Sequence, residues 1–435
     1  MKKSIVFLFL SAFTLTASFG QFSPNCYALK DISVIDVVSK KVLQHYTIII
    51  HNNTIETIGS VKEIAIPDSV TVFNYLGKYV MPGLIDTHVH LATEPTKEDN
   101  RARAEKDLKD MLVSGVTSVR DMAGDARALG SLSRDAGLDI IISPDIYYSA
   151  LMAGPGFFKD PRTHQSTQGG VAGEMAFMKA VTDSTDLRIA VAEAKGSGAT
   201  AIKLYAELSG ELARKITLEA HRQHMLVWSH ANLDNASPLE VINAGVNSIS
   251  HAAMISGWYS RNVPPVCLKP GLDKLFWDSL FRTLPVADYI KAMRANKTIL
   301  DATMLTFDEA GTDTSLPINR RLAWLAMYEI GKRFTMLAEK EGIPVCTGMD
   351  VDNNKFVQRE MKFLVKQCGF TPMEVLVSAT KNGALAIGIE KNVGAVEKGK
   401  IADLLVLSAD PSADIANLDK VEVVIKNGKL FNAAN

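Results

Sequence analysis

The sequence is poor in cysteine and has no long run of charge of one sign. Its 4 cysteines are too few and too scattered for a disulfide scaffold, although a single bridge stays open, and we expect Cys346 and Cys368 to be buried apolar side chains. The 47 basic residues balance 48 acidic ones, so nothing in the chain attracts a polyanion. Nucleic acid is therefore not expected as a partner.

Beyond its first residues, the sequence also lacks an apolar stretch long enough to span a membrane. At the N-terminus, two lysines precede an apolar stretch that begins at Ile5 and gives way to small residues near Gly20. The stretch has roughly 13 residues against the about 20 that a spanning helix needs, which favours cleavage over a retained anchor. We expect 1–20 to be a signal peptide and the mature protein to be exported, either periplasmic or secreted.

Both ends of the mature chain consist of short β-rich pieces separated by polar turns. In 21–80 these pieces are ISVIDVVS, HYTIII, NTIETIGS and SVTVFNYLG, which predict a small antiparallel unit. In 386–435, DLLVLSAD and VEVVIKNGKLF have the same character. Neither part holds enough strands to stand well alone, so we expect both termini to pair into one small β-sandwich.

The segment between them, 81–385, alternates short apolar strands with helical stretches, which is typical of βα units and a parallel sheet. The predicted strands are GLIDTHVH, VTSVRDM, DIIISPDIYYS, TAIKLYA, MLVWSH, VNSISH, TILDATM and IPVCTGMD. Eight such strands predict an α/β fold with a closed (β/α)8 TIM barrel. Two long connections, 150–187 and 257–284, leave the carboxyl ends of strands and are candidates for pocket walls or lids.

Two histidines stand two residues apart in MPGLIDTHVHL, at the end of the first of these strands. A strand has a period of two, so His88 and His90 point to the same face and can converge on one point at the barrel mouth. Taken alone, a His-X-His pair is more often two surface or hydrogen-bonded histidines than a metal site. The His88–His90 pair therefore indicates a metal site only if further ligands lie at the ends of other strands.

Four more polar residues fall at or near the ends of the fourth, fifth, sixth and eighth predicted strands. They are Lys203 in GATAIKLYA, His230 in LVWSHA, His251 in VNSISHA and Asp350 in PVCTGMD. In a barrel these strand ends form one ring, so imidazoles and a carboxylate would meet there. Such a ligand set suits zinc or a similar divalent ion rather than a thiolate-dominated structural site.

Lys203 does not fit this set directly, because an ammonium has no lone pair to offer a metal. Two alternatives stay open: a desolvated amine of lowered pKa, or a lysine carbamylated by carbon dioxide, whose carboxylate would bridge two cations. A lysine whose head simply reaches solvent from the strand end is a third alternative, which the apolar sequence around IKLY makes unfavourable.

These motifs, in this order, resemble the metal signature of the amidohydrolase superfamily over nearly the whole mature chain. GAVEKGKIADLLVLSAD resembles the segment with which many members return to the N-terminal sandwich. Within the superfamily the chain resembles imidazolonepropionase-like and dipeptide-cleaving, prolidase-like members. The resemblance implies two divalent ions, expected to be zinc, with His88, His90 and Asp350 on the first, His230 and His251 on the second, and carbamylated Lys203 bridging both.

The sequence departs from the prolidase-like pattern in the segments expected to line the pocket. The region after the third strand reads YYSALMAGPGFFKDPR instead of containing a Gly-Gly-His-Gly element, and its first histidine is His164. We keep His164 and Tyr205, two residues after Lys203, as candidate substrate contacts. These departures bear on the substrate, which we expect to be a small molecule or a short peptide, and leave the predicted metal ligands intact.

The predicted mechanism is hydrolysis of an amide, cyclic amide or peptide-like C–N bond by a hydroxide that bridges the two cations. Such cations lower the pKa of water from about 16 toward about 7, and Asp350 would act as general base and then general acid. The alternatives are lactone or ester hydrolysis, deamination, and a metal-containing binding protein without turnover. Leu233 occupies the position where mononuclear deaminases of the superfamily usually have a glutamate, which disfavours deamination. Homo-oligomer formation stays open.

Overall fold

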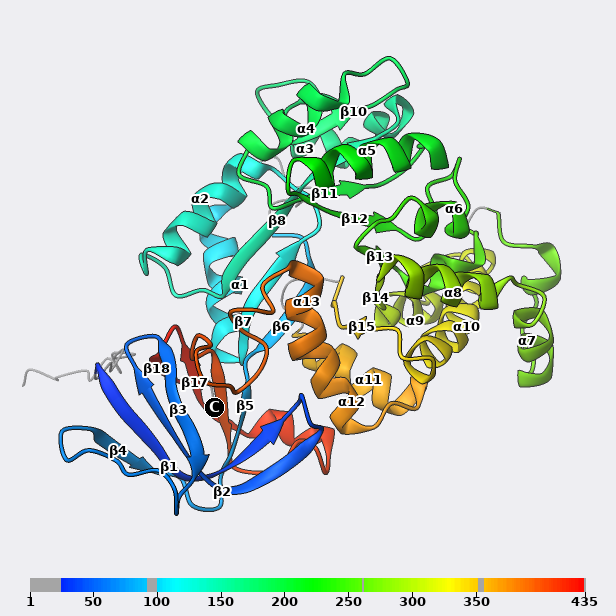
Figure 1. The fold of residues 1–435 in the computed structure, drawn as a ribbon. Coiled ribbons are helices and arrows are strands. Elements are labelled where there is room, and N and C mark those ends of the chain that lie inside the picture. The colour runs from blue at the N-terminus through cyan, green and yellow to red at the C-terminus, as the bar shows by residue number, and fades with distance from the viewer. Residues whose placement is uncertain (1–24, 92–99, 260–261, 351–355, 434–435) are drawn as a thin grey trace, which may run out of the picture.

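The computed structural model describes residues 25–91, 100–259, 262–350 and 356–433, so the predicted signal peptide lies outside the described residues. Figure 1 shows a large α/β body and a smaller β domain beside it, in which the first strands of the chain, in blue, lie next to the last ones, in red. The division into a barrel and a domain made from both termini is therefore as the sequence predicts.

The large body is a barrel of parallel strands whose neighbours follow chain order. Its strands are β6 (Leu84–Val89), β7 (Val116–Asp121), β8 (Asp145–Ala153), β11 (Ala201–Leu204), β12 (Leu226–His230), β13 (Ser248–Ser250), β14 (Ile299–Asp301) and β15 (Val345–Cys346). Between its first and last strands, Thr87 N donates to Thr347 O at 3.0 Å and Asp350 N donates to His88 O at 2.9 Å. These bonds join the two ends of the sheet, and the predicted TIM barrel is confirmed.

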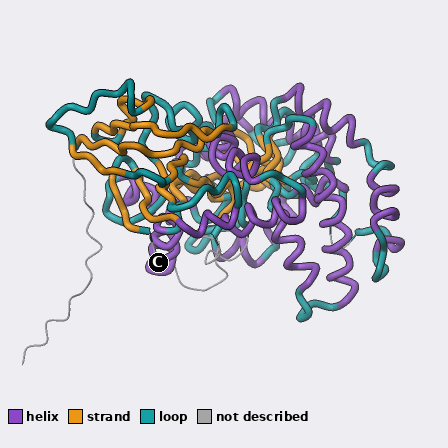
Figure 2. The backbone as a smooth tube through the Cα atoms, turned by 90° about the horizontal axis from the view of Figure 1, so that it is seen from below, coloured by secondary structure: helices purple, strands orange, loops and turns teal. Residues whose placement is uncertain are grey.

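Helices pack around the barrel, and in Figure 2 they are the purple coils in the middle and at the right, whereas most orange strands at the left belong to the smaller β domain. The described α-helices are α1 (Arg101–Val113), α2 (Ala126–Gly137), α3 (Pro161–Gln165), α4 (Leu187–Gly196), α5 (Gly210–Arg222), α6 (Pro238–Asn243), α7 (Lys274–Phe281), α8 (Val286–Asn296), α9 (Met304–Thr312), α10 (Ile318–Lys340), α11 (Gln358–Cys368), α12 (Pro372–Val377) and α13 (Gly383–Ile387). No described helix has both the length and the apolar character needed to cross a membrane.

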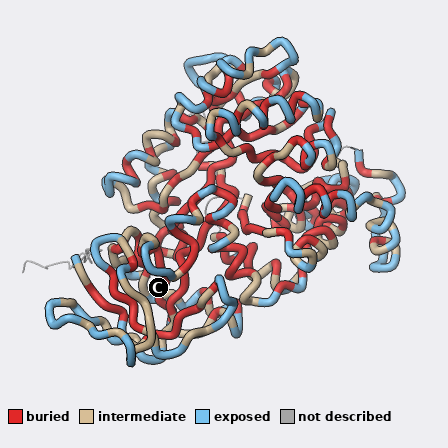
Figure 3. Tube along the Cα trace, viewed as in Figure 1, coloured by how far each residue is buried: buried red, intermediate tan, exposed pale blue. Residues whose placement is uncertain are grey.

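Helix α5 illustrates why these segments are helical and how they pack. Leu212, Ile216 and Ala220 recur every four residues and are all buried, which forms one apolar stripe against the barrel. The Ser209 side chain accepts a hydrogen bond from Leu212 N and so caps the first turn. Figure 3 shows the consequence for the whole body, a buried strand layer inside helices whose outer faces are exposed.

The third barrel strand begins later than predicted. The run DIIISPDIYYS predicts one continuous strand, but β8 begins at Asp145, and Asp139 has a φ of 56° in the turn after α2. Ile140 is 63% exposed there. A short apolar run does not show by itself whether its side chains are buried. Here α2 extends to Gly137, and the isoleucines lie in the linker between α2 and β8.

The small domain is a single curled sheet with the strand order β18-β17-β16-β5-β1-β2-β3, and β4 pairs with β1. Its strands are β1 (Cys26–Asp36), β2 (Lys41–His51), β3 (Thr54–Ser60), β4 (Thr71–Asn74), β5 (Tyr79–Pro82), β16 (Leu404–Leu407), β17 (Val421–Lys426) and β18 (Lys429–Asn432). Side chains from both chain ends, among them Leu29, Ile48 and Val406, form one core.

The expectation of a purely antiparallel unit is wrong, because β1 pairs in parallel with both β4 and β5. The first half of β1 pairs with β4 and its second half with β5, and an irregularity in its register lies between them, where Asp31 has a φ of 58°. This bend lets one long strand serve two parallel neighbours. On its other side, β5 pairs with β16 and leads within two residues into β6, the first barrel strand.

Candidate functional site

The barrel gathers the six predicted metal-site residues at the carboxyl ends of its strands. His88 lies in β6 and His90 directly follows it, Lys203 lies in β11, His230 ends β12, His251 follows β13 and Asp350 follows β15. All six line one cavity of about 950 Å³. Segments that are up to 262 residues apart in sequence (350 minus 88) thus meet because the sheet closes on itself.

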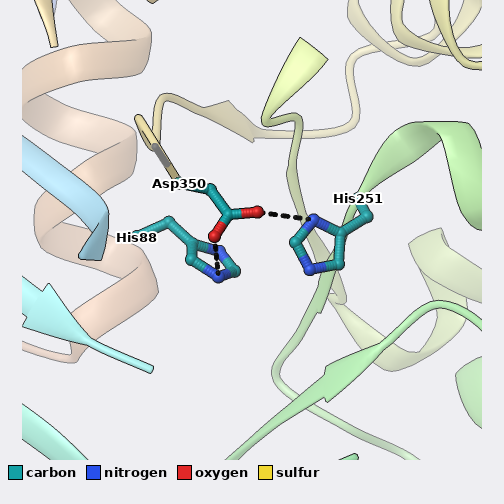
Figure 4. A group of neighbouring side chains, drawn as sticks. All are labelled: His88, His251 and Asp350. Atoms are coloured by element: carbon teal, nitrogen blue, oxygen red, sulfur yellow. Dashed lines mark ion pairs between the residues drawn. The ribbon is translucent and has the colours of Figure 1, made fainter. Parts of the chain in front are cut away.

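The carboxylate of Asp350 is the centre of this cluster. Asp350 Oδ1 lies 3.2 Å from His90 Nε2 and 3.5 Å from His88 Nε2, and Asp350 Oδ2 lies 3.6 Å from His251 Nδ1. Figure 4 shows this carboxylate between the imidazoles of His88 and His251. One ligand atom from each of these three residues falls within 4.8 Å of the others, a spacing that suits a shared metal ion.

Unusual backbone conformations accompany the cluster. Six non-glycine residues at or just beyond the ends of barrel strands adopt positive φ, namely Ala123, Glu207, Asp234, His251, Thr303 and Asp350. Each such conformation costs about 1 to 3 kcal/mol and persists only where the surroundings hold it. Five of the six line the cavity, and the exception, Thr303, contacts the cluster through His251. Of the 14 described non-glycine residues with positive φ, these 6 thus lie around the predicted ligands.

A buried carboxylate orients the first histidine from below. His88 Nδ1 lies 2.7 Å from Asp301 Oδ2, and both side chains are almost completely buried. Because an ionised carboxylate only accepts hydrogen bonds, Nδ1 carries the proton and Nε2 presents its lone pair toward Asp350. Burial would raise the pKa of Asp301, but its interaction with His88, including the hydrogen bond, and the charge of Arg120 lower it to about 2.

The remaining two imidazoles lie side by side near Tyr205. The rings of His230 and His251 have centroids 4.7 Å apart, and the ring of Tyr205 is centred 4.0 Å from that of His230. His251 Nδ1 also lies 2.8 Å from Thr303 Oγ1. His230 Nδ1 is buried and has no hydrogen-bond partner among the described residues. A buried ring nitrogen without a partner is expected of a side chain that is built to bind something else.

Lys203 is completely buried, and among the described residues its Nζ has one hydrogen-bond partner, Ser250 Oγ at 3.1 Å. An ammonium has three donors, so two of them would stay unsatisfied at a substantial cost. Burial lowers the pKa of Lys203 to about 7, and the Arg120 charge also lowers it, against the opposing effect of Asp301. The disfavoured alternative, a lysine whose head reaches solvent, is therefore excluded, whereas the desolvated amine and the carbamylated side chain both stay open.

The electrostatics of the cluster favour neutral imidazoles at His88, His230 and His251 beside an ionised Asp350. Burial would lower the pKa of His90, but its hydrogen bond to Asp350 and the charge of that carboxylate raise it. Burial lowers the pKa of His230, and it lowers the pKa of His251 to about 3. Burial alone would raise the pKa of Asp350, but His88, His90 and His251 hold it well below its usual range. Neutral imidazole and ionised carboxylate are the forms that ligate divalent cations. The donor set and its protonation therefore fit a metal site.

The walls of the cavity come partly from segments that the sequence did not single out. Phe307 and Trp324, whose rings pack edge to face at 5.3 Å, lie on α9 and α10. On the other side Phe157 packs against Tyr205 with ring centroids 4.5 Å apart. Periodicity alone gives Phe307 and Trp324 the appearance of ordinary core, so no sequence signal marked these two, whereas Tyr205 and the segment that contains Phe157 were predicted to line the pocket.

Of the two long connections, the first forms a wall of the cavity and the second contributes little to it. Gly156, Phe157, Asp160, Arg162, Thr163, Ser166 and Met178 of the segment 150–187 line the cavity. Within the described part of 257–284, only Tyr259 does so. His164 lies in α3 with an exposed side chain and is not among the lining residues, whereas Tyr205 is.

Comparison of the sequence with known proteins agrees with this geometry. The sequence model of the amidohydrolase family matches residues 79–431. Ochratoxinase of Aspergillus niger is 25% identical over 440 aligned positions, which cover 89% of this chain and 83% of that one. An imidazolonepropionase of Symbiobacterium thermophilum is 32% identical over 139 positions, which cover 30% of this chain and 32% of the relative.

Solved structures resemble the fold over almost its whole length. A Xaa-Pro dipeptidase with methionine bound in its active site has a TM-score of 0.74 and 22% identity, covering 94% of this chain and 100% of that one. The crystal structure of A. niger ochratoxinase has a TM-score of 0.74 and 20% identity, covering 94% and 95%. At these identities the likeness shows the fold, in which a barrel is joined to a small β domain.

Proposed function

Because this chain belongs to the amidohydrolase family, whose hydrolases act on carbon–nitrogen bonds, we propose that it is a metal-dependent enzyme that hydrolyses an amide or cyclic amide bond in a small molecule or short peptide. The observation that carries this proposal is the convergence of four histidines, Lys203 and Asp350 on one cavity. A buried set of this composition is costly unless it binds a cation.

The proposed cofactor is a pair of divalent ions, most simply zinc. Asp350 with His88 and His90 offers one group of donors, and His230 with His251 offers a second. Divalent ions in such a site lower the pKa of water toward neutrality and polarise a carbonyl. Two buried polar atoms support this fit. Among the described residues, His230 Nδ1 has no hydrogen-bond partner, and Lys203 Nζ has one partner for its three donor positions.

We propose that Lys203 is carbamylated and lies between the two groups of donors. Its amine is buried, donates to Ser250 and lines the same cavity as the four imidazoles, so a terminal carboxylate on it could supply oxygen ligands to that cavity. Carbamylation replaces an unsatisfied cation with an anion whose oxygens suit divalent metals. The modification therefore removes the electrostatic conflict between the lysine and its neighbours.

Asp350 is proposed to transfer the proton during hydrolysis. Its carboxylate, kept ionised by the surrounding histidines, can accept a proton from the attacking water and deliver it to the departing nitrogen. Its backbone is fixed for this role, since Asp350 N donates to His88 O and Thr306 Oγ1 donates to Asp350 O at 2.9 Å. The side chain therefore stays at the centre of the cluster.

The cavity walls support a substrate with apolar groups on either side of the scissile bond. Phe157 and Tyr205 lie on one wall, and Phe307 and Trp324 lie on another, each pair in ring contact. Tyr205, whose ring is centred 4.0 Å from that of His230, is the proposed contact for the carbonyl side of a bound amide. Ochratoxinase and the Xaa-Pro dipeptidase are named for acting on an ochratoxin and on dipeptides, so dipeptides and N-acyl amino acids bearing aromatic groups are the first candidates.

The test of this proposal is a metal count combined with a substrate panel. Elemental analysis of the purified protein is expected to give two equivalents of metal, falling to one or fewer in Lys203→Ala. Chelation should abolish turnover of dipeptides or N-acyl amino acids, and added Zn²⁺ should restore it. Faster turnover of lactones than of amides would favour the ester-hydrolase alternative, and tight binding of ligand without any turnover would favour a binding protein.

Export is a separate proposal that rests on the N-terminal sequence. Residues 1–20 carry the pattern of a signal peptide and lie outside the described residues. The test is fractionation of the native host followed by N-terminal sequencing, with a new terminus near Gly20 expected in the exported fraction. An intact N-terminus in the cytoplasm would contradict the proposal.

A further inference from the structure

The barrel interior beneath the metal-site cluster holds a completely buried arginine, Arg120 of β7. Its guanidinium donates from Nε to Thr87 O at 2.6 Å and from Nη1 to Ser248 Oγ at 3.0 Å. Its flat face lies 4.7 Å from the ring centroid of Trp228, another fully buried side chain. A guanidinium stays charged in a protein, so a full positive charge lies under the site without being part of it.

The counter-charge to this arginine is the carboxylate that orients His88. Arg120 Nη2 donates to Asp301 Oδ2 at 2.9 Å, and Ser250 Oγ donates to the same oxygen at 3.0 Å. Since the hydroxyl proton of Ser250 points to Asp301, its lone pairs accept from Lys203 Nζ at 3.1 Å. One carboxylate oxygen therefore connects Arg120 to His88 along one branch and to Lys203 along another.

We propose that Arg120 is a positioning residue for the metal site: by anchoring Asp301, it holds the imidazole of His88 and, through Ser250, the head of Lys203 in the arrangement that receives metal. This inference rests on the proposed function, because it concerns ligands of that same site. Arg120 does not line the cavity and is not one of the six predicted metal-site residues, so its proposed role is to hold the ligands in place.

The physical reason lies in the cost of an unpaired charge. Asp301 is completely buried, and removing its cation leaves a carboxylate that is stabilised, among the described residues, by the hydroxyls of Ser250 and Thr87 and by the imidazole of His88. A buried ion without its partner costs about 3 to 5 kcal/mol, so Asp301 would turn toward water or admit it. Either change releases His88 Nδ1, and the imidazole loses the single orientation that directs Nε2 toward Asp350.

The experiment compares metal binding in the intact wild-type protein with that in Arg120→Met and Arg120→Lys. Affinity for Zn²⁺ is measured by competition with a chelator, and the melting temperature of the metal-free protein is measured in parallel. We expect Arg120→Met to bind Zn²⁺ about 10- to 100-fold more weakly, the range seen when the support of a metal ligand is removed. Arg120→Lys keeps the charge but not the fork of donors, so it should recover part of the affinity.

A matched control separates positioning from general destabilisation. Lys426→Met also removes a buried cation from a buried carboxylate, Asp403, but does so at the junction with the small domain, away from the cavity. It should lower the melting temperature of the metal-free protein while leaving Zn²⁺ affinity unchanged. Equal losses of affinity in Arg120→Met and Lys426→Met, or no loss in either, would overturn the inference.

The proposal can still be tested if Arg120→Met does not fold. Ser250→Ala then carries the test. It cuts the branch from Asp301 to Lys203 while Arg120 and His88 stay on Asp301, and it should reduce the bound metal toward one equivalent. Unchanged metal content in Ser250→Ala, with Arg120→Lys binding as the wild type does, would overturn the proposal. If the wild-type protein binds no divalent metal, the proposed function itself fails. If the wild type binds two ions and the Arg120 variants bind them equally well, the proposed function stands and only the role of Arg120 is wrong.

Discussion

Lys426, in β17 of the small domain, forms an ion pair with Asp145, the first residue of barrel strand β8, with Nζ 2.7 Å from Oδ2. The same Nζ lies 3.2 Å from Asp403 Oδ2, and both Lys426 and Asp403 are buried. Residues that are 281 positions apart thus hold the C-terminal strands against the base of the barrel. The two domains are joined by buried charge as well as by the chain that runs from β5 into β6.

We expect Lys426→Met to destabilise the protein by about 3 to 5 kcal/mol, because it leaves the buried carboxylate of Asp403 without its positively charged partner. Lys429→Met is the matched control: Lys429 pairs with Asp139 at 2.6 Å, but the two side chains are 29% and 51% exposed. Solvent screens such a pair, so its loss should cost less than about 1 kcal/mol. Urea unfolding of the two variants measures the difference, and equal costs would contradict the prediction.

The architecture of both domains could be predicted from the sequence because it depends on repeated local patterns. Alternation of apolar strands with helical stretches predicted the barrel, and matching β-rich ends predicted their pairing. The parallel pairing of β1 with β4 and β5 could not be predicted, since it depends on a bend at Asp31 and not on the composition of the strands. The late start of β8 was hidden for a similar reason, because Ile140 is apolar and nevertheless exposed.

Asp350→Asn tests the proposed proton transfer. The amide keeps the size of the side chain but cannot accept and then return a proton, so kcat should fall by about 10²- to 10⁴-fold with a smaller change in KM. Steady-state kinetics on the best amide substrate from the panel measures both parameters. Asp234→Asn, at another carboxylate that lines the cavity, serves as the control and should change kcat far less. A comparable loss in both variants would assign the effect to cavity charge instead of proton transfer.

Gly348→Ala tests whether the close packing behind His88 is required. A Cβ on Gly348 would lie 2.4 Å from His88 Cβ and 2.8 Å from Asp301 Oδ1, distances at which an atom must move. Neither neighbour is the free end of a flexible chain, so we expect His88 to shift and Zn²⁺ content to fall. Gly196→Ala, at the end of α4 with no atom within 4 Å of its added Cβ, should keep its metal and be neutral or slightly more stable.

The meeting of the six side chains in one cavity could be predicted from the sequence, whereas the residues that support them could not. His88 and Asp350 stand out in sequence because polar residues at the ends of apolar strands are unusual. Asp301 and Arg120 have the same kind of signal, in TILDATM and VTSVRDM, but a carboxylate and a guanidinium within a strand indicate no partner by themselves. Only closure of the barrel brings Arg120 Nη2 to Asp301 Oδ2, a contact between residues 181 positions apart.

Glu360, at the start of α11, provides a test by pH that does not involve the predicted ligands. Its carboxylate oxygens accept hydrogen bonds from Met304 N and Leu305 N, both at 2.8 Å, and so cap the first turn of α9, which carries Phe307. Burial raises the pKa of Glu360 to about 8, although these two backbone donors oppose the shift. The folded protein therefore binds a proton that the unfolded chain, with a carboxyl pKa of about 4.3, has already released near neutral pH.

A raised folded-state pKa means that the stabilising contribution of Glu360 is fully present below about pH 4.3 and is lost as pH rises through about 8, with an ideal slope of about 1.4 kcal/mol per pH unit. Glu360→Gln cannot titrate, so it lacks this dependence. We expect the difference in unfolding free energy between wild type and Glu360→Gln, measured by urea titration from pH 5 to about pH 8, to shrink or reverse in favour of the variant as pH rises. A difference that stays constant over this range would mean that Glu360 is already ionised in the folded protein, with the N-terminus of α9 outweighing the effect of burial.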